Sequence, residues 1–481
     1  MAQHKYEVVI GLEVHAQLST NTKLFAGDST SFGAAPNTHV SPITLAHPGT
    51  LPTMNKEVIA LAIKLGIALQ CDIAPLHYFA RKNYFYPDLP KGYQVSQHTN
   101  PICNGGFVTI NTASGEKKIQ LNRIHIEEDA GKSLHDLYDT HTAIDLNRAG
   151  TPLLEIVTEP CIHSADEAFA YITVLRKIVR WLNVCDGNME EGSLRCDANI
   201  SIRLKGETTL GTRVEVKNLN SIRNVKKAIE VEVDRLIGIT EAGEKIKQET
   251  RSYDADNNRT FSLRSKEDAD DYRYFPEPDL PAFEISTVDI EAIKKTMPML
   301  PNAWQTHLVN TYGLSLYDAA AICIDKADAE MYERLVTLTN NYKSTANWLI
   351  GPFRNYCIDK QTNLSEFPLN ETAMADIIMY TDKGMVHYNV ASTKLLMAYI
   401  DHPNSNAAAL AQQLQLIQEN DTDALSKWVD EALAAMPDKV KEYKAGKKGL
   451  IGLFAGQVKK LSGGKADMQT VNKLIESKLS S

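Results

Sequence analysis

The sequence predicts an α+β protein in which a largely antiparallel sheet with interspersed helices is followed by two helical regions. Short runs in residues 1–292 alternate apolar and polar side chains with a period of two, as in YEVVIGLEVHAQL and LRCDANISIR. Such alternation is typical of antiparallel strands with one open face. After residue 300, apolar side chains recur at three- and four-residue spacing, which indicates helices. Proline-rich segments separate the two patterns and indicate a domain boundary.

The individual elements follow from the same periodicities. Helical spacing covers residues 56–69, 165–182, 224–237, 328–338 and 343–350. The segments FPEPDLPAFE at 275–284 and TMPMLP at 296–301 end the first region, and DHPNSN at 401–406 is a second break. Shorter helices are expected from there to the end of the chain. We therefore expect three domains, over residues 1–292, 293–407 and 408–481.

The composition fits a soluble, well-cored protein. The chain has 481 residues, of which 43% are hydrophobic and 23% charged, and this excludes a wholly disordered protein. No run approaches the ~20 uninterrupted apolar residues of a membrane span. The segment MAQHKYEVVIGLEVH lacks the pattern of a secretory signal, and the seven cysteines form no CxxC pair. We expect a cytoplasmic protein without a disulfide scaffold.

The charge is unevenly distributed. The formal net charge is -9, yet residues 437–481 hold ten lysines against four acidic residues. A basic tail on an acidic body is typical of a phosphate-contacting module attached to a soluble enzyme. A solvated helix surface is the alternative interpretation, and the charge pattern alone favours it.

The first alternating run carries a candidate catalytic face. In GLEVHAQ the polar residues Glu13, His15 and Gln17 alternate with apolar ones, so they share the face opposite the core. A carboxylate beside an imidazole on one rigid strand suits metal binding or proton transfer. The alternative is a solvent-facing polar stripe, which the pattern alone favours.

Two further runs contain acidic residues, and burying an ionised carboxylate without a partner costs free energy. Glu155 lies in the middle of the apolar run LLEIV, where a carboxylate needs a functional cation or a structural partner such as Arg148. In HIEED, alternation groups His125 with Glu127 and assigns Glu128 to the other face unless a bulge intervenes. Acids gathered with imidazole would form an oxygen-rich site, which suits Mg²⁺ better than Zn²⁺. The alternative for HIEED is an acidic surface turn.

Basic side chains of the same region could contact phosphates. The polar faces of alternating runs carry Arg195, Arg203, Arg213 and Lys217. Cations of this kind stabilise the charge of a transferring phosphoryl group. Cross-strand pairing with acids such as Asp197 and Glu215 is the alternative.

Several long motifs, taken together, resemble one known family. They are VIGLEVHAQL, RKNYFYPDLPKGYQVSQ, HIEEDAGKS, DLNRAGTPLLEIVTEP, MEEGSLRCDANISIR, VEVKNLNS and DDYRYFPEPDLP. In this order, along nearly the whole chain, they closely resemble the B subunit of the aspartyl/glutamyl-tRNA amidotransferase. The resemblance implies a cradle domain related to glutamine synthetase, then a helical domain, then a small helical tail that touches tRNA.

The resemblance also implies a reaction and partners. The family is a ligase that forms carbon–nitrogen bonds with glutamine as amido donor, and it converts Glu-tRNA(Gln), and often Asp-tRNA(Asn), to the amide form. ATP phosphorylates the side-chain carboxylate of the esterified amino acid, and ammonia then displaces the phosphate. The ammonia comes through a channel from a glutaminase A subunit, and a small C subunit wraps the pair. The chain contains nothing like the Ser–Ser–Lys glutaminase signature, which agrees with a partner that supplies ammonia.

Carried over residue by residue, the resemblance assigns candidate sites. The implied magnesium ligands are His15, Glu128 and Glu155, and Glu13 belongs to the same catalytic group. The implied phosphate or channel residues are Lys82, Tyr84 and Lys91, and Arg195 is expected to serve ATP phosphates. The implied tRNA contacts are Lys447, Lys448, Lys459 and Lys460.

The sequence departs from the family pattern at one place. Many relatives carry two cysteine pairs that bind zinc near the N-terminus, whereas the matching stretches here read FAGD at 25–28 and SPIT at 41–44. We therefore expect no zinc and a loop held by packing.

Other interpretations remain open at this point. A tRNA-binding scaffold with an inert pocket would not need acids on the face of Glu13 and His15. The archaeal-type E subunit carries a large inserted domain, for which 481 residues leave no room. A free-standing ligase related to glutamine synthetase would give the basic tail no role. The sequence does not distinguish Glu-tRNA(Gln) from Asp-tRNA(Asn) as the substrate.

Overall fold

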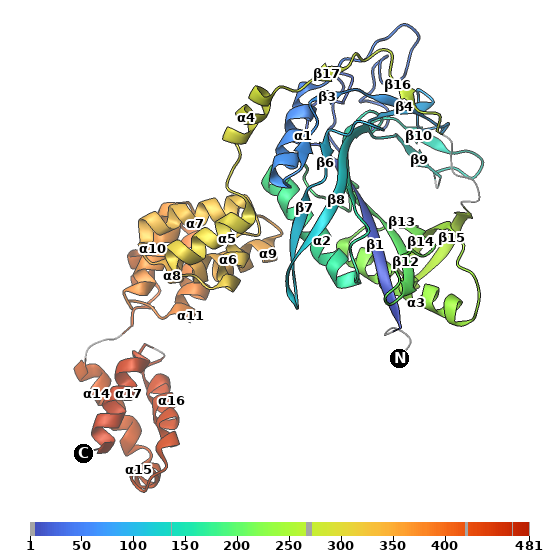
Figure 1. Cartoon of the computed structure of the whole chain (residues 1–481). Coiled ribbons are helices and arrows are strands. Elements are labelled where there is room, and N and C mark those ends of the chain that lie inside the picture. Colours follow the sequence, from blue (N-terminus) through green and yellow to red (C-terminus); the bar gives the residue numbers. More distant parts are fainter. Residues whose placement is uncertain (1–4, 136, 266–271, 419–421, 464, 481) are drawn as a thin grey trace. The chain divides into compact units, whose positions relative to one another are not determined.

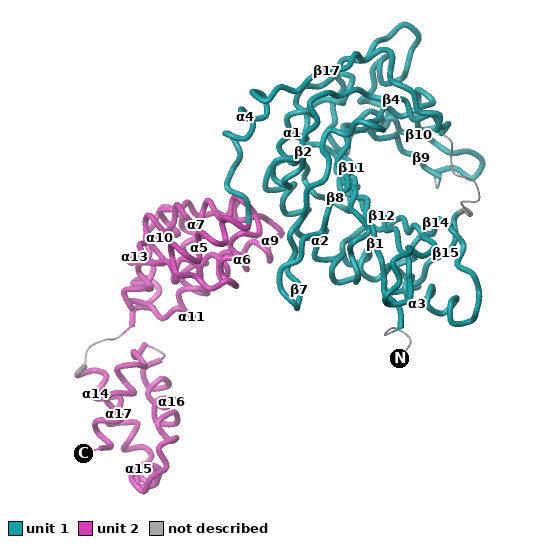
Figure 2. The backbone as a smooth tube through the Cα atoms, viewed as in Figure 1, with its two compact units in different colours: residues 1–301 teal, residues 302–481 magenta. Residues whose placement is uncertain are grey.

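A computed structural model describes residues 5–135, 137–265, 272–418, 422–463 and 465–480. The chain forms two compact units, residues 1–301 and 302–481 (Figure 2). The first unit contains a large sheet, and the described part of the second is helical (Figure 1), which confirms the α+β fold class. Among the described residues, no helix has the length and apolar character of a membrane span. The domain boundaries at 292 and 407 stay predictions, and Asp270 and Asp271 of the motif DDYRYFPEPDLP lie outside the described residues.

The strands belong to the first unit. They are β1 (Tyr6–Gln17), β2 (Asp72–Ile73), β3 (Leu76–His77), β4 (Ala80–Asn83), β5 (Tyr93–Ser96), β6 (Cys103–Asn104), β7 (Phe107–Thr112), β8 (Gly115–Glu128), β9 (Lys132–Leu134), β10 (Ala143–Asp145), β11 (Pro152–Thr158), β12 (Leu194–Leu204), β13 (Val214–Lys217), β14 (Glu249–Asp254), β15 (Arg259–Ser265), β16 (Phe275–Pro276) and β17 (Phe283–Glu284).

Thirteen of these strands form one mixed sheet. Its main path runs β15-β14-β13-β12-β1-β11-β8-β5-β4-β16, with β6 and β7 paired to β8 and β2 paired to β6. Neighbours along the path are antiparallel except the parallel pair β13–β14. The central strand β1 lies between β11 and β12, so His15 is paired with Glu155 on one side and with Arg195 on the other. The register therefore brings three separate sequence motifs to one point of the sheet.

Helices of the first unit cover one face of this sheet (Figure 1). They are α1 (Lys56–Ala68), α2 (Ala165–Trp181), α3 (Ile222–Glu241) and the peripheral α4 (Thr287–Lys295). The first three begin at side-chain caps, supplied by Asn55, Ser164 and Ser221. Their apolar faces pack on fully buried sheet residues such as Leu12 and Ile156. The opposite sheet face is left for polar residues.

The second unit is helical in its described part. Its helices are α5 (Pro301–Tyr312), α6 (Leu316–Ile322), α7 (Lys326–Thr339), α8 (Tyr342–Trp348), α9 (Arg354–Lys360), α10 (Glu371–Asp382), α11 (Tyr388–Val390), α12 (Leu396–Asp401), α13 (Ala407–Gln413), α14 (Thr422–Ala434), α15 (Pro437–Lys444), α16 (Ile451–Leu461) and α17 (Met468–Ser480), with π-helical turns at Leu349–Phe353 and Ala391–Leu395. The helices α14 to α17 share a core that includes Leu425, Val429, Phe454 and Ile475. That core explains why this segment can fold as a bundle despite its many lysines.

Candidate active site

The uncovered face of the sheet carries a large polar cavity. Its volume is about 1310 Å³, and its lining includes Glu13, His15, Gln17, Lys82 and Glu155. The alternation of β1 produces this arrangement, since Leu12 and Val14 are fully buried against the helices while their neighbours face the cavity. The structure thus confirms that Glu13, His15 and Gln17 share one face.

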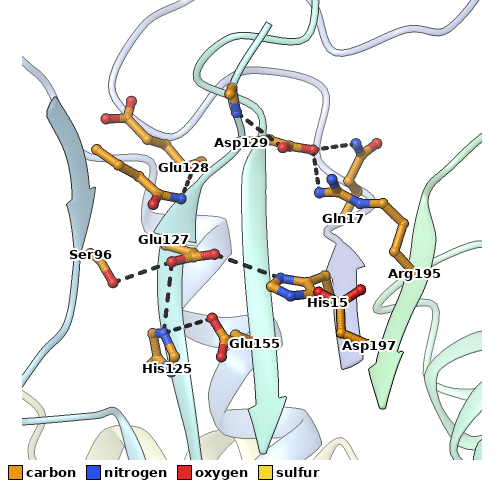
Figure 3. A network of polar contacts seen from close by, with 12 residues as sticks. His15, Gln17, Ser96, His125, Glu127, Glu128, Asp129, Glu155, Arg195 and Asp197 are labelled. Carbon is orange, nitrogen blue, oxygen red and sulfur yellow. Dashed lines mark hydrogen bonds and ion pairs between the residues drawn. The ribbon is translucent and has the colours of Figure 1, made fainter. Parts of the chain in front are cut away.

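Two histidines and two glutamates form a network (Figure 3), of which His15, Glu127 and Glu155 line the cavity. His15 Nδ1 lies 3.7 Å from Glu127 Oε1, and His125 Nε2 lies 3.3 Å from Glu155 Oε2 and 3.7 Å from Glu127 Oε2. The Ser96 hydroxyl donates a hydrogen bond of 3.3 Å to Glu127. Three adjacent strands, β1, β11 and β8, therefore converge on one charged cluster.

The charges of this network stabilise one another. Burial opposes ionisation of all four groups, but the two carboxylates outweigh it and raise the pKa of His15 and, to about 9, that of His125. In return the imidazolium of His125 lowers the pKa of Glu127 and Glu155 below their ordinary values. The network without a bound cation is thus a set of buried, mutually compensating charges.

A second acidic group lies beside the first. Glu13, Asp197 and Glu215 have carboxylate oxygens within 4.8 Å of one another. Lys217 Nζ lies 3.1 Å from Glu215 and also pairs with Asp197, and Asn199 donates a hydrogen bond of 2.9 Å to Glu13. Burial and the charge of Glu155 raise the pKa of Glu13. Lys217 therefore pairs with Asp197 and Glu215, as the alternative interpretation of the sequence expected. This pairing occurs inside the cavity.

The donor set fits a hard divalent cation. Glu13, His15 and Glu155 also have ligand atoms within 4.8 Å of one another, as do His125, Glu127 and Glu155. The His15 Nδ1 atom is buried without a hydrogen bond among the described atoms. A set of carboxylate oxygens with one imidazole suits Mg²⁺ or Mn²⁺ better than Zn²⁺.

Glu128 lies apart from this group, and its assignment as a magnesium ligand with His15 and Glu155 stays a prediction. Glu127 faces His15, whereas Glu128 points away from it (Figure 3) and lines a separate cavity of about 150 Å³. There Glu128 forms an ion pair with Lys91 and accepts a hydrogen bond of 2.9 Å from the Val95 amide. The irregularity between β11 and β8 lies at Val157 and not at the acids.

The predicted basic residues divide between the two cavities. Lys82 lines the large one, where its ammonium lies 4.9 Å from the Tyr272 ring centre and 5.7 Å from that of Tyr84. Lys91 lines the small one beside Glu128. Arg195 lines the large cavity and pairs with Asp129 at 2.8 Å, which raises the pKa of the guanidinium.

Asp129 is a functional candidate that the sequence pattern did not indicate. Its carboxylate also accepts a hydrogen bond of 2.8 Å from Gln17 and lies 3.7 Å from Arg148. Arg148 is therefore not the structural partner of Glu155. It pairs instead with Asp129 and donates to the carbonyl oxygens of Ala130 and Gly131.

Loop 25–52 borders both cavities and is held by hydrogen bonds. The carboxylate of Asp28 accepts bonds from the Ser41 amide and hydroxyl at 3.1 and 2.8 Å and from the Thr44 hydroxyl. Lys23, whose residue surface is only 1% exposed, donates to the carbonyl oxygens of His39 at 2.7 Å and Leu146 at 3.3 Å. Burial lowers the pKa of Lys23 to about 8. Lys23 is a lone lysine in an irregular segment, so the sequence gave no indication that its ammonium would bind these carbonyl oxygens.

The four lysines predicted to contact RNA are exposed on the C-terminal helices and their connections. Lys447 lies 3.0 Å from Glu442, and Lys448 lies 4.3 Å from the Tyr443 ring centre. No hydrogen bond or ion pair involves the side chains of Lys459 and Lys460 in the part of the chain that the structure describes. The structure does not bring these lysines together with the cavity residues in one unit.

Comparison with known proteins gives consistent matches along the chain. Residues 8–291 match the family described as the GatB/GatE catalytic domain, and residues 330–479 match the GatB domain. A protein of Paraburkholderia xenovorans, named as the B subunit of aspartyl/glutamyl-tRNA(Asn/Gln) amidotransferase, is 47% identical over 99% of both chains. Proteins with the same name from Alkalilimnicola ehrlichii and Chlorobium limicola are each 46% identical, over 99% of this chain and at least 99% of their own length.

Proposed function

The chain belongs to the GatB/GatE family, and from this premise we propose that it is the B subunit of a tRNA-dependent amidotransferase. The reaction joins nitrogen to carbon at the expense of ATP, with glutamine as the amido donor. The γ-phosphoryl group of ATP passes to the side-chain carboxylate of the glutamate or aspartate esterified to tRNA, and ADP leaves. Ammonia then attacks the carbonyl carbon, phosphate leaves, and Gln-tRNA(Gln) or Asn-tRNA(Asn) results.

The convergence of acidic and basic groups in one cavity carries this proposal. Carboxylates alone would repel both ATP and a carboxylate substrate, so the acidic groups need a cation to be productive. Glu13, His15, Glu127, Glu155, Asp197 and Glu215 are the residues that would hold Mg²⁺. When bound there, Mg²⁺ would neutralise phosphate charge and polarise the transferred phosphoryl group.

The cations of the cavity complete the site. Lys217 and Lys82 face the same space as the acids, so they can orient phosphate oxygens on either side of the reacting group. Arg195 is held by Asp129 and can offer its remaining guanidinium donors to phosphate or substrate. Because these residues lie on paired strands, their positions are fixed before substrates arrive.

The small cavity at the end of β8 supports a path for ammonia. It is lined by Lys91, Glu128 and Lys23, and the neighbouring Asp129 borders both cavities. A polar route of this kind would bring ammonia from a glutaminase subunit to the activated carboxylate without release to water. We propose that the A and C subunits complete the enzyme, that its first domain is a glutamine-synthetase-like cradle, and that it acts in the cytoplasm.

The C-terminal helices are proposed to bind tRNA. Exposed Lys447, Lys448, Lys459 and Lys460 would contact phosphates, which favours recognition of RNA shape over base sequence. The alternative is that the chain is a non-catalytic tRNA-binding scaffold of the same complex.

The deciding experiment uses the chain co-expressed with its A and C partners. The complex receives Glu-tRNA(Gln), Mg-ATP and ammonium chloride, and Gln-tRNA(Gln) formation is followed with and without ATP. ATP-dependent product formation is the expected result, and Asp-tRNA(Asn) is the next substrate to test. Tight tRNA binding without turnover would overturn the catalytic assignment in favour of the scaffold.

A further inference from the structure

A group of basic side chains lies at one end of the large cavity. Arg148, Arg195 and Gln17 line the cavity there, together with Asp129. The Asp129 carboxylate accepts hydrogen bonds of 2.8 Å from both Arg195 and Gln17, and it lies 3.7 Å from the Nε atom of Arg148. These four residues form the arginine group. Because two guanidinium groups share one carboxylate, this end of the cavity carries a positive charge that the group itself does not neutralise.

The arginine group and the second acidic group lie toward opposite ends of one stretch of β1. Glu13 and Gln17 are four positions apart on this strand, which corresponds to roughly 13 Å at ~3.3 Å per residue. Figure 3 shows the Arg195 guanidinium beyond His15, on the side away from Asp197 of the second acidic group. The acids around Glu13 are proposed to hold Mg²⁺ and, through it, the phosphates of ATP. The end at Gln17 is therefore open to a different anion.

The guanidinium of Arg195 keeps donors for a ligand. Its Nη2 atom donates to Asp129, whereas its Nε atom is buried and has no hydrogen-bond partner within the described part of the chain. Arg148 is more fully engaged, since its Nε and Nη2 atoms donate to the carbonyl oxygens of Ala130 and Gly131. A guanidinium group carries donors only, in a planar fork that matches the two oxygens of a carboxylate. A ligand of Arg195 must therefore present negatively charged acceptors.

The position of the ammonia path decides between the two anions of the reaction. These anions are the triphosphate of ATP and the side-chain carboxylate of the amino acid esterified to tRNA. Asp129 lines both the large cavity and the small one that is proposed to conduct ammonia. Ammonia must attack the carbon of the same carboxyl group that receives the phosphoryl group. The carboxylate is therefore expected beside Asp129, between the phosphates and the ammonia path.

We propose that Arg195, oriented by Asp129, binds the side-chain carboxylate of the esterified amino acid and selects it against the amide. The inference rests on the proposed function and specifies which part of the substrate the site recognises. One carboxylate oxygen attacks the γ-phosphorus of ATP, the bond from that phosphorus to the β–γ bridging oxygen breaks, and ADP leaves with the electron pair. The guanidinium holds the other carboxylate oxygen. An amide in the same place would turn its N–H donors toward those of the guanidinium, and unpaired donors are costly.

The first test uses Arg195→Gln in the complex with the A and C subunits. Glutamine offers both a donor and an acceptor, so it accommodates a carboxylate and an amide alike. We expect KM for Glu-tRNA(Gln) to rise at least tenfold and KM for ATP to stay within twofold. Arg259→Gln is the matched control, because this exposed arginine of β15 also lies beside an aspartate, 3.5 Å from Asp254. A rise confined to KM for ATP would assign the guanidinium to phosphate and overturn the proposal.

Discrimination between acid and amide gives a readout that a merely structural role would not change. The product Gln-tRNA(Gln) is used as a competitor of Glu-tRNA(Gln). For the wild type and Arg259→Gln, the inhibition constant of the product should exceed KM of the substrate at least tenfold. For Arg195→Gln the two constants should agree within twofold. The same ratio in Arg195→Gln as in the wild type, or a ratio near one in the wild type, would overturn the selection.

A double variant tests the positioning role of Asp129. Asp129→Asn keeps the size of the side chain but removes the charge that holds the guanidinium, so KM for Glu-tRNA(Gln) should rise several-fold. In the Arg195→Gln background the same change should add less than a further twofold, because Asp129 acts through Arg195. Effects that multiply in the double variant would overturn the positioning role.

These results are distinguishable from failure of the proposed function. If the wild-type complex forms no amide, filter binding without ATP compares its affinities for Glu-tRNA(Gln) and Gln-tRNA(Gln). Tighter binding of Glu-tRNA(Gln) by the wild type and by Arg259→Gln, lost in Arg195→Gln, would still support the carboxylate site. Equal affinities of the wild type for the two tRNAs would overturn it.

Discussion

The sheet face and the C-terminal helices use charge in opposite ways. In the network beside the cavity, Glu127 and His125 have side chains only 5% and 4% exposed, and each contacts an opposite charge. On α16, Lys459 and Lys460 are exposed on a helix whose apolar side forms a core. Buried charges at fixed positions interact strongly but only with a ligand that matches their geometry. Exposed lysines each contribute little, and salt screens them. The first arrangement suits chemistry and the second suits holding a large polyanion.

The largest expected effect tests the buried side of this comparison. Glu155→Gln removes one of the buried charges that compensate His125 and His15, so ATP-dependent amidation should fall about a thousandfold, or ~4 kcal/mol of transition-state stabilisation. Glutaminase activity of the complex should stay largely intact. Glu116→Gln, at an exposed position of β8, is the matched control. Equal loss of both activities would indicate an assembly defect instead.

The next prediction concerns the cost of burying a cation. The native pKa of Lys23 is about 8, against an ordinary value of 10.5, so the folded state binds fewer protons between these values and stability rises with pH there. Burying the ammonium destabilises the folded state fully below pH 8, and this destabilisation is lost progressively as the pH rises to 10.5. Relative to Lys23→Met, the wild type should gain about 3 kcal/mol over this range.

Pulse proteolysis in urea, read on fragments of the first unit, measures this difference. The exposed Lys56→Met is the matched control. A pH-independent difference between wild type and Lys23→Met would contradict the buried-ammonium explanation.

A third prediction sharpens the division between two neighbouring acids. Glu127 faces the large cavity and Glu128 the small one. Glu127→Gln should lower kcat about a hundredfold whether ammonium chloride or glutamine supplies nitrogen. Glu128→Gln should reduce the glutamine-driven reaction more than the ammonium-driven one. If the ratio of the glutamine-driven rate to the ammonium-driven rate were the same in both variants, the two cavities would not have separate roles.

The smallest effect is expected on the exposed side. Replacing both Lys459 and Lys460 with glutamine should lower the slope of log affinity against log salt for tRNA by about 1.5, at ~0.7–0.9 per phosphate contact. Lys478→Gln is the comparison, because that ammonium lies 2.6 Å from Asp430. An unchanged slope would show that Lys459 and Lys460 belong to an ordinary solvated surface and do not contact tRNA phosphates.

Local periodicity predicted much of the fold. The helices expected at 56–69, 165–182 and 224–237 are found at Lys56–Ala68, Ala165–Trp181 and Ile222–Glu241. Each begins at a capping side chain that satisfies free amides. The parallel pairing of β13 with β14 could not be predicted, because strand order depends on contacts between distant segments.

The positions of the site residues were predictable where alternation along a strand alone decides which face a side chain occupies. It placed Glu13 and His15 together, and it grouped His125 with Glu127, as the structure has them. The grouping of Glu128 with His15 departed from alternation and stays a prediction, since Glu128 lines the small cavity in the structure. Lys23 and Asp129 went unrecognised because their roles depend on the carbonyl group of Leu146 and the guanidinium of Arg195, which lie far from them in the sequence.

The central position of β1 has a consequence for synthesis. This strand leaves the ribosome before both of its neighbours, since β11 begins only at Pro152 and β12 only at Leu194. At roughly 5–20 residues per second, it waits roughly 7 to 28 seconds for its first neighbour. Unpaired strand edges promote aggregation. The nascent chain is therefore most vulnerable before β1 is enclosed, and a chaperone that shields the segment preceding Pro152 would act at the critical time.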